Sequence, residues 1–317
     1  MEDMHVIVTG AAGLIGSHLV DRLLLTGHAV VAVDDFSTGR SHNLDEARSD
    51  DRFTFVEGDV TDPSVWDRID RLGEPSRLFH LACPPSPVDF TTMPLQILRT
   101  CSTGTLLATG FARHHGCRLL LASTSEVYGE PLVHPQTESY TGNVTTVGPR
   151  ACYDEGKRFA EAVVSSSTRS EGLDGCIARM FNTYGPRMRA DDGRVVASFV
   201  NSALRDQPLT VHGSGDQTRS FCFVDDLVQG LMALMASDLA GPVNIGNDAE
   251  MTILDLAETV LEVTGSRSRI EHRPLPVDDP TRRRPDLTVA RSELGWEPTT
   301  SLRSGISRVV EHFRRHA

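Results

Sequence analysis

The sequence has little lysine, few aromatic residues and no long apolar run. Only one of its 31 basic residues is a lysine, Lys157, whereas Asp and Glu number 43, for a formal net charge of −12. Because a negatively charged chain repels the phosphate backbone, we expect no nucleic-acid partner. No apolar run reaches the roughly 18 residues that a membrane span needs, so we expect no membrane partner.

Paired cysteines are also missing. The six cysteines lie far apart, without a C-x-x-C motif, at positions 83, 101, 117, 152, 176 and 222. This spacing predicts reduced thiols and no structural zinc, and we expect no bound metal. The N-terminus enters an apolar strand almost at once, without the regions of a signal peptide, which predicts a cytoplasmic protein.

The composition and the order of apolar runs predict an α/β fold. Hydrophobic residues make up 39% of the 317 residues and charged residues 23%, which is typical of a globular chain. Apolar strand-length runs such as His28–Val33 and Arg118–Ser123 alternate with amphipathic stretches of helical period, among them Leu95–His114. This alternation is typical of a doubly wound parallel sheet that is covered by helices on both faces.

A glycine-rich turn follows the first expected strand, His5–Val8. The turn reads Thr9-Gly10-Ala11-Ala12-Gly13-Leu14-Ile15-Gly16 and leads into a helix. Its glycines allow a tight turn and a close approach to a pyrophosphate, which the amides at the helix N-terminus then face. The second strand ends at Asp34 and Asp35, where a carboxylate can bond the adenosine ribose and repels a 2′-phosphate. We therefore expect NAD rather than NADP.

Another carboxylate, Asp59, follows the third expected strand, Phe53–Val56. Asp59 could accept a hydrogen bond from the adenine amine. It could equally cap the helix that follows. The sequence leaves both interpretations open.

Tyr153 and Lys157 lie four residues apart at the head of an expected helix, so both side chains leave the same face. A free tyrosine has a pKa near 10, which is too high for a base at neutral pH. A neighbouring ammonium and a positive nicotinamide ring would lower that pKa by stabilising the phenolate. Surface pairs share this spacing, but Lys157 is the only lysine in the chain, which favours a proton-transfer site.

A cluster of hydroxyl groups ends the expected strand at 119–122. It reads Ser123-Thr124-Ser125-Glu126 and precedes Val127-Tyr128-Gly129. Such a cluster can cap the next helix. Together with the Tyr/Lys pair, however, it favours a substrate site.

These motifs give the chain a family resemblance along essentially its whole length. The G-x-x-G-x-x-G spacing and the Tyr/Lys pair resemble the extended short-chain dehydrogenase/reductases that act on nucleotide sugars. The segments STSEVYG, GPRACYDEGKR, NTYGPRM, DDGRVVASF, PLTVHGSG, TRSF and RRRPD resemble the UDP-glucuronate decarboxylases and the related UDP-glucuronate 4-epimerases. In both, Tyr153 would take the proton of the 4-hydroxyl while hydride passes from C4 to NAD⁺, which leaves a 4-keto uronic acid.

The resemblance implies a domain organisation. Residues 1–180 would form a Rossmann NAD-binding domain that carries the catalytic Tyr and Lys. Residues 181–317 would form mainly a UDP-sugar-binding lobe, with some segments returning to the sheet. A homodimer would form through the helices at 95–114 and 153–169.

The resemblance also implies site residues. Thr124 would bond the sugar hydroxyl beside Tyr153, and Ser125 and Glu126 would face C5 and the C6 group. The cofactor would contact Gly10, Gly13, Leu14, Ile15, Gly16, Asp34, Asp35, Asp59, Val60, Leu81, Ala82, Tyr153 and Lys157. The UDP-uronic acid substrate would contact Pro85, Thr124, Asn182, Arg189, Val195, Thr210, His212, Arg219 and Arg283.

Asn182 and Arg219 would hold the diphosphate, and the stretch Thr210–Gly213 would lie near uracil. An arginine of the triplet Arg282-Arg283-Arg284 would also hold the UDP. His212 stands where the family usually has a tyrosine. Cys101 stands where the family has an asparagine that bonds the backbone of the active-site strand.

Other departures bear on the product. Phe90 and Thr92 stand where the decarboxylases tend to have tyrosines, and Thr141 where they have tryptophan, so a ketose would have more room to turn over. Arg189 replaces their histidine and matches an arginine of the 4-epimerases, where it could clamp the sugar carboxylate. Glu126, in contrast, is a decarboxylase feature. We take 4-epimerisation to UDP-galacturonate as the first hypothesis and decarboxylation to UDP-xylose as the alternative.

A third hypothesis is a non-catalytic regulator that senses dinucleotide through the same fold. It predicts that the Tyr or the Lys is missing, and both are present. A 4,6-dehydratase would have an Asp-Glu pair after the active-site threonine, where this chain has Ser125-Glu126.

Overall fold

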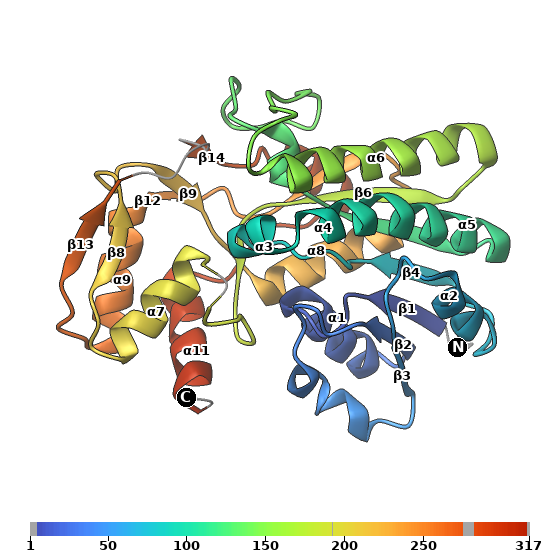
Figure 1. Ribbon diagram of the computed structural model, residues 1–317, viewed down its shortest axis with the longest axis horizontal. Coiled ribbons are helices and arrows are strands. Elements are labelled where there is room, and N and C mark those ends of the chain that lie inside the picture. Colours follow the sequence, from blue (N-terminus) through green and yellow to red (C-terminus); the bar gives the residue numbers. More distant parts are fainter. Residues whose placement is uncertain (1–4, 192, 275–281, 316–317) are drawn as a thin grey trace.

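A seven-stranded parallel sheet forms the centre of the computed structural model, which describes residues 5–191, 193–274 and 282–315. Across the sheet the strand order is β11-β6-β5-β4-β1-β2-β3 (Figure 1). The strands are β1 (His5–Thr9), β2 (Ala29–Asp34), β3 (Phe53–Glu57), β4 (Arg77–His80), β5 (Arg118–Thr124), β6 (Gly175–Met180) and β11 (Pro242–Ile245). The α/β doubly wound fold expected from the sequence is confirmed.

Helices cover both faces of this sheet, which explains why its inner strands are apolar on both sides. One face carries α1 (Leu14–Leu25), α8 (Val224–Ala236) and α10 (Thr288–Leu294). The other carries α2 (Pro63–Asp70), α4 (Pro94–Arg99), α5 (Thr105–His115) and α6 (Ala151–Glu171). Leu19 and Leu231 are buried on the first face, and Trp66 and Val164 on the second. In β1, consecutive residues Ile7 and Val8 therefore belong to two different hydrophobic cores.

The helical stretch expected over Leu95–His114 is confirmed, and a π-helical turn lies within it. The chain forms α4, then the π-helical turn at Thr100–Gly104, and then α5. Cys101 lies within the π turn.

The smaller lobe lies to the left in Figure 1 and contains short sheets and three helices. The helices are α7 (Val195–Leu204), α9 (Ile253–Thr264) and α11 (Leu302–Arg315). The strands are β7 (Thr183–Tyr184) with β10 (Cys222–Phe223), β8 (Leu209–His212) with β13 (Ile270–Arg273), and β9 (Thr218–Ser220) between β12 (Glu250–Thr252) and β14 (Arg282–Arg283). A short helix, α3 (Pro87–Thr92), follows β4. The chain after residue 180 also supplies β11 and α8 to the large sheet.

None of the helices in the described part of the chain combines the length and the apolar character that crossing a bilayer requires.

Candidate active site

A cleft opens at the carboxyl ends of β1 and β4, where the strand order reverses. Ligands of doubly wound sheets bind at such a switch point. The cleft, together with the solvent space at its open mouth, has a volume of about 1120 Å³. All thirteen residues expected to contact the cofactor line it: Gly10, Gly13, Leu14, Ile15, Gly16, Asp34, Asp35, Asp59, Val60, Leu81, Ala82, Tyr153 and Lys157.

The glycine turn leaves no room for side chains at two of its positions. Gly10 has a φ of +69°, and a Cβ there would lie 2.8 Å from the Ala82 amide nitrogen. A Cβ on Gly16 would lie 2.1 Å from the carbonyl oxygen of Gly10. Gly13 is the N-cap of α1 and supplies no side-chain cap. The amides at the start of α1 therefore remain available to a phosphate, so the turn fits the pyrophosphate of a dinucleotide.

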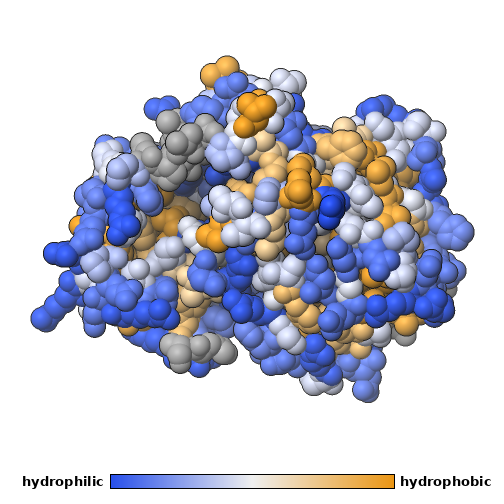
Figure 2. Space-filling view, in the orientation of Figure 1, coloured by the Kyte–Doolittle hydropathy of each residue, from blue (hydrophilic) through white to orange (hydrophobic). Residues whose placement is uncertain are grey.

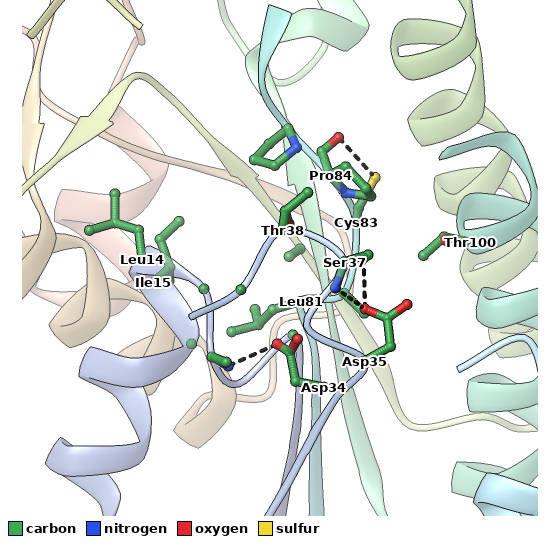
Figure 3. A pocket seen from close by; sticks show the side chains of 18 of the residues that line it. Leu14, Ile15, Asp34, Asp35, Ser37, Thr38, Leu81, Cys83, Pro84 and Thr100 are labelled. Carbon is green, nitrogen blue, oxygen red and sulfur yellow. Dashed lines mark hydrogen bonds between the residues drawn. The ribbon is translucent and has the colours of Figure 1, made fainter. Parts of the chain in front are cut away.

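Asp34 braces this turn from the end of β2 (Figure 3). Its carboxylate accepts hydrogen bonds from the amides of Ala12 and Phe36, both at 2.8 Å. Burial raises the pKa of Asp34, although the two amide bonds act in the opposite direction. The neighbouring Asp35 accepts from the amide and the hydroxyl of Ser37. Two carboxylates thus lie beside the glycine turn, an arrangement that would fit a free ribose better than a 2′-phosphate.

Asp59 does not cap α2, so one of its two sequence interpretations was wrong. The N-cap of α2 is Asp62, whose side chain accepts from the Ser64 amide. Asp59 lines the cleft and accepts from the Thr61 amide at 2.8 Å. Its position fits the adenine contact, which stays a prediction.

Tyr153 and Lys157 are both buried at the other end of the cleft, 6% and 5% exposed. The Lys157 ammonium donates to the Ala122 carbonyl at 2.8 Å and lies 5.9 Å from the centre of the Tyr153 ring. The phenol is hydrogen bonded to Thr124. The expected Tyr, Lys and Thr therefore come together.

The pKa of the Tyr153 phenol differs from the sequence expectation. Burial, followed by the electrostatic influence of Cys83, raises this pKa well above its usual value in the protein alone. The expectation that Lys157 lowers it underestimated the desolvation of a fully enclosed phenol. Additional positive charge beside the ring is therefore needed before Tyr153 can act as a base at neutral pH.

Glu126 lies within a cluster of arginines, two residues after Thr124. The Arg150 guanidinium is 2.5 Å from the Glu126 carboxylate, and the Arg283 guanidinium is 3.1 Å from it. Arg283 is 1% exposed and also donates to the Ser125 carbonyl at 2.9 Å. Burial favours the neutral acid, but Arg283, Arg150 and then Arg219 outweigh it and lower the pKa of Glu126 to about 2. The carboxylate is therefore ionised at neutral pH.

Strand pairing places the arginines of this cluster. Arg283 in β14 lies opposite Arg219 in β9, in parallel register. On the other side, β5 ends at Thr124, whose hydroxyl accepts the Glu126 amide at 3.2 Å and starts a 3₁₀ turn, Ser125–Tyr128. The sequence prediction gave an arginine of the triplet at 282–284 as a UDP ligand. In the structure the Arg283 guanidinium lies against Ser125 and Glu126, because the β9–β14 pairing carries it there.

Arg189 has a partner within the protein. Its guanidinium contacts both carboxylate oxygens of Asp89, at 3.1 and 3.3 Å. Asp89 lies in α3 and is 3% exposed, and both residues line the cleft. The 4-epimerase hypothesis requires this guanidinium to clamp the substrate carboxylate, which in the structure would mean giving up a buried ion pair.

The remaining expected substrate residues are spread around the cleft and the smaller lobe. Pro85 lines the cleft and is exposed. Asn182 follows β6, and Val195 begins α7. Thr210 and His212 lie in β8, where the His212 ring contacts the Pro274 carbonyl at 3.0 Å.

Sequence reasoning missed Arg150 and Asp89. Arg150 precedes Tyr153 by three residues and immediately precedes α6. Its closeness in sequence to Tyr153 and Lys157 could have identified it as a candidate site residue. Asp89 pairs with Arg189, 100 positions away, and no local sequence pattern predicts such a pair.

The family model described as GDP-mannose 4,6 dehydratase matches residues 7–309. UDP-glucuronic acid decarboxylase 1 of Arabidopsis thaliana is 50% identical over 311 residues, which cover 98% of this chain and 70% of that protein. UDP-glucuronic acid decarboxylase 1 of Danio rerio is 46% identical over 310 residues, 98% of this chain and 72% of that protein.

Solved structures of epimerases are similar in fold. UDP-glucose 4-epimerase of Thermotoga maritima, solved with UDP-glucose, superposes with a TM-score of 0.92 at 30% identity and covers 99% of each chain. UDP-glucuronic acid 4-epimerase of Bacillus cereus, solved with UDP-glucuronic acid and NAD, superposes with a TM-score of 0.88 at 25% identity, over 99% of this chain and all of that one.

Proposed function

Because the chain belongs to the GDP-mannose 4,6 dehydratase family of extended short-chain dehydrogenase/reductases, we propose that it uses NAD to convert UDP-glucuronate to UDP-xylose and carbon dioxide. Relatives that carry the decarboxylase name match 98% of the chain at up to 50% identity. The 4-epimerase of uronic acids is similar at 25% identity. The comparisons thus favour the alternative of the sequence analysis over its first hypothesis.

The Glu126 cluster is the observation that carries the proposal. Arg150, Arg219 and Arg283 all act on the ionised carboxylate of Glu126, which lies next to Thr124. Asp154 also faces this cluster, but burial, with help from Glu126, raises its pKa to about 7, so it is only partly ionised at neutral pH. Guanidinium groups gathered beside Thr124 suit a sugar that carries its own carboxylate, because a guanidinium can bind a carboxylate through two hydrogen bonds.

The buried pair above the cluster begins the chemistry. Thr124 and Tyr153 orient the sugar 4-hydroxyl, and the Tyr153 phenolate takes its proton. NAD⁺, when bound, accepts the hydride of C4 and later returns it, and its positive nicotinamide ring adds the charge that the phenol needs. Lys157 keeps its ammonium beside the phenol, anchored on the Ala122 carbonyl.

Oxidation at C4 makes the carboxylate at C6 part of a β-keto acid. The electron pair of the C5–C6 bond can then move into the ketone as carbon dioxide leaves. The negative charge that develops on the C4 oxygen is stabilised by Thr124 and Tyr153. C5 takes up a proton in place of the carboxylate, and ketone reduction at C4 gives the xylose ring.

The Arg189–Asp89 pair supports decarboxylation over epimerisation. An epimerase must retain the carboxylate while the ketose turns over, and Arg189 was the group expected to retain it. With that guanidinium already bound to a buried carboxylate, the substrate carboxylate has no dedicated clamp at this position.

Product analysis by NMR tests the proposal. Protein incubated with UDP-glucuronate and catalytic NAD⁺ in D₂O should form UDP-xylose with one deuterium at C5 and release carbon dioxide. UDP-galacturonate without carbon dioxide release would establish the epimerase instead. Net accumulation of NADH would exclude both, because each returns the hydride to the sugar.

Two variants sharpen this test. The double variant Asp89→Asn/Arg189→Gln removes the pair without leaving a buried charge, and UDP-xylose should remain its product. Glu126→Gln should lower kcat about 100-fold or more, since it removes the charged centre of the cluster. If the double variant abolished turnover while Glu126→Gln retained it, the proposal that the sugar carboxylate binds beside Glu126 would be wrong.

We also propose that the active form is a homodimer. Exposed apolar side chains gather on α4, the start of α5, and α6, where Figure 2 shows orange atoms on this face. They are Leu95, Leu98, Leu106 and Phe159. Light scattering should give twice the chain mass, and Leu106→Glu should shift it toward the monomer.

A further inference from the structure

Two thiols touch each other beneath the catalytic tyrosine. The Sγ atoms of Cys83 and Cys101 are 3.5 Å apart. Cys83 follows β4, whereas Cys101 lies in the π turn between α4 and α5. Both pack in one small apolar cluster with Tyr153 and Phe90. No other Sγ–Sγ contact occurs among the described residues.

The two sulfurs differ in access. Cys83 is half-buried and lines the cofactor cleft, with Thr100 across from it (Figure 3). Cys101 is 3% exposed. Either thiol can donate the hydrogen bond between them, and the positive charge of Lys157 acts to lower the pKa of both. A small oxidant therefore reaches the pair from the cleft, through Cys83.

We propose that Cys83 and Cys101 are a modification site, a thiol pair that a peroxide closes into a disulfide and that thereby switches off the enzyme proposed above. Each closure breaks two S–H bonds and the O–O bond of one peroxide. It forms one S–S bond and, with hydrogen peroxide, two molecules of water. The sulfurs lose two electrons, and the peroxide oxygens gain them.

Closing the bond must move parts of the catalytic machinery. An S–S bond is about 2.05 Å long, so the sulfurs have to approach by about 1.5 Å from 3.5 Å. On one side, Cys101 packs on α6, since a Cβ on Gly156, between Tyr153 and Lys157, would lie 3.2 Å from the Cys101 sulfur. A shift of this sulfur therefore disturbs the support of both catalytic residues.

On the other side, Cys83 continues the wall of the cleft formed by Ala82. That wall already lies against the glycine turn, where a Cβ on Gly10 would be 2.8 Å from the Ala82 amide nitrogen. The wall cannot move toward the turn without a clash. Displacements of about 1 Å at reacting groups can cost two orders of magnitude in rate. We therefore expect the disulfide to lower turnover by at least tenfold.

The same geometry predicts that the cofactor protects the pair. Access to Cys83 runs through the cleft, which a dinucleotide would fill. Protein stripped of NAD should therefore oxidise faster than protein saturated with it.

Thiol mapping after peroxide treatment tests the site. Reduced wild-type protein, with and without NAD⁺, is exposed to hydrogen peroxide, alkylated under denaturing conditions and analysed by mass spectrometry. We expect a linked Cys83–Cys101 peptide, loss of UDP-glucuronate turnover and full recovery with dithiothreitol. Cys101→Ser should have the same activity before and after the peroxide treatment.

Cys152→Ser is the matched control, because Cys152 lies in the same apolar cluster and contacts the Phe90 carbonyl rather than a thiol. It should form the cross-link like wild type. The proposal fails if no Cys83–Cys101 peptide forms, if Cys101→Ser is inactivated as fast as wild type, or if the linked protein keeps full activity. If reduced protein does not turn over UDP-glucuronate, the proposed function fails, while the peptide map and NAD protection still decide the thiol site.

Discussion

Replacing Glu126 by glutamine should destabilise the protein by an amount that the arginine cluster sets. The carboxylate is 15% exposed, and its pKa is lowered from 4.5 to about 2. At about 1.4 kcal/mol per pKa unit, a difference of 2.5 units corresponds to about 3 kcal/mol. Glutamine imitates the neutral acid and removes the main counter-charge of the buried Arg283, so Glu126→Gln should lose roughly this amount at pH 7.

The pH dependence follows from the direction of the shift. Because the folded pKa lies below the unfolded one, the stabilisation is fully present above pH 4.5 and is lost as the pH falls toward about 2. The gap between wild type and Glu126→Gln should therefore be the same at pH 7 and pH 5 and smaller at pH 3. Urea unfolding curves at these three pH values measure it.

Glu155→Gln is the matched control. Glu155 pairs with Arg158 at 3.6 Å on α6 and is 35% exposed, so its replacement should cost less than about 1 kcal/mol. If Glu126→Gln cost no more than Glu155→Gln, or if its effect were equally large at pH 3, the reasoning about the buried cluster would be refuted.

Three further predictions follow from the site. Lys157→Arg should lower kcat at least about 100-fold with the fold retained by circular dichroism, because a guanidinium does not fit the ammonium position; activity near wild type would contradict this. Gly16→Ala should abolish NADH binding measured by fluorescence, because its Cβ would lie 2.1 Å from the Gly10 carbonyl oxygen. In Gly13→Ala the new Cβ would lie 3.3 Å from the same oxygen, so this variant should keep the fold. Asp154→Asn should raise the stability at pH 8 by up to about 4 kcal/mol, because burial raises the pKa of the Asp154 carboxyl from 3.8 to about 7 and the cost of ionising it is complete only above pH 7. Near pH 4 the unfolding curves of the variant and the wild type should coincide. An equal gain in stability at pH 4 and pH 8 would argue against this reasoning.

The fold and the cofactor cleft could be read from local patterns. Strand and helix periods, the glycine turn and the carboxylates after β2 each depend on residues close together in the chain. The structure brings all of the expected cofactor residues to one cleft. The helical stretch at Leu95–His114 was also predicted, but apolar periodicity does not register the π-helical turn at Thr100–Gly104 within it.

The choice between products could not be read in the same way. The 4-epimerase hypothesis depended on a free Arg189, and whether a guanidinium is free depends on a partner 100 residues away. Burial was also invisible in the sequence. The pKa of Tyr153 was expected to fall and instead rises in the protein alone, because enclosure of the phenol outweighs the nearby ammonium.

The sequence by itself determined the family, the parallel sheet and the Tyr153/Lys157 pair, because these depend on spacing along a helix or between a strand and a turn. Only the tertiary structure decided which charges surround the sugar end and which thiols touch. The contacts of Glu126 with Arg283 and of Cys83 with Cys101 join distant segments. They are set by how strands pair and helices pack, which no local spacing records.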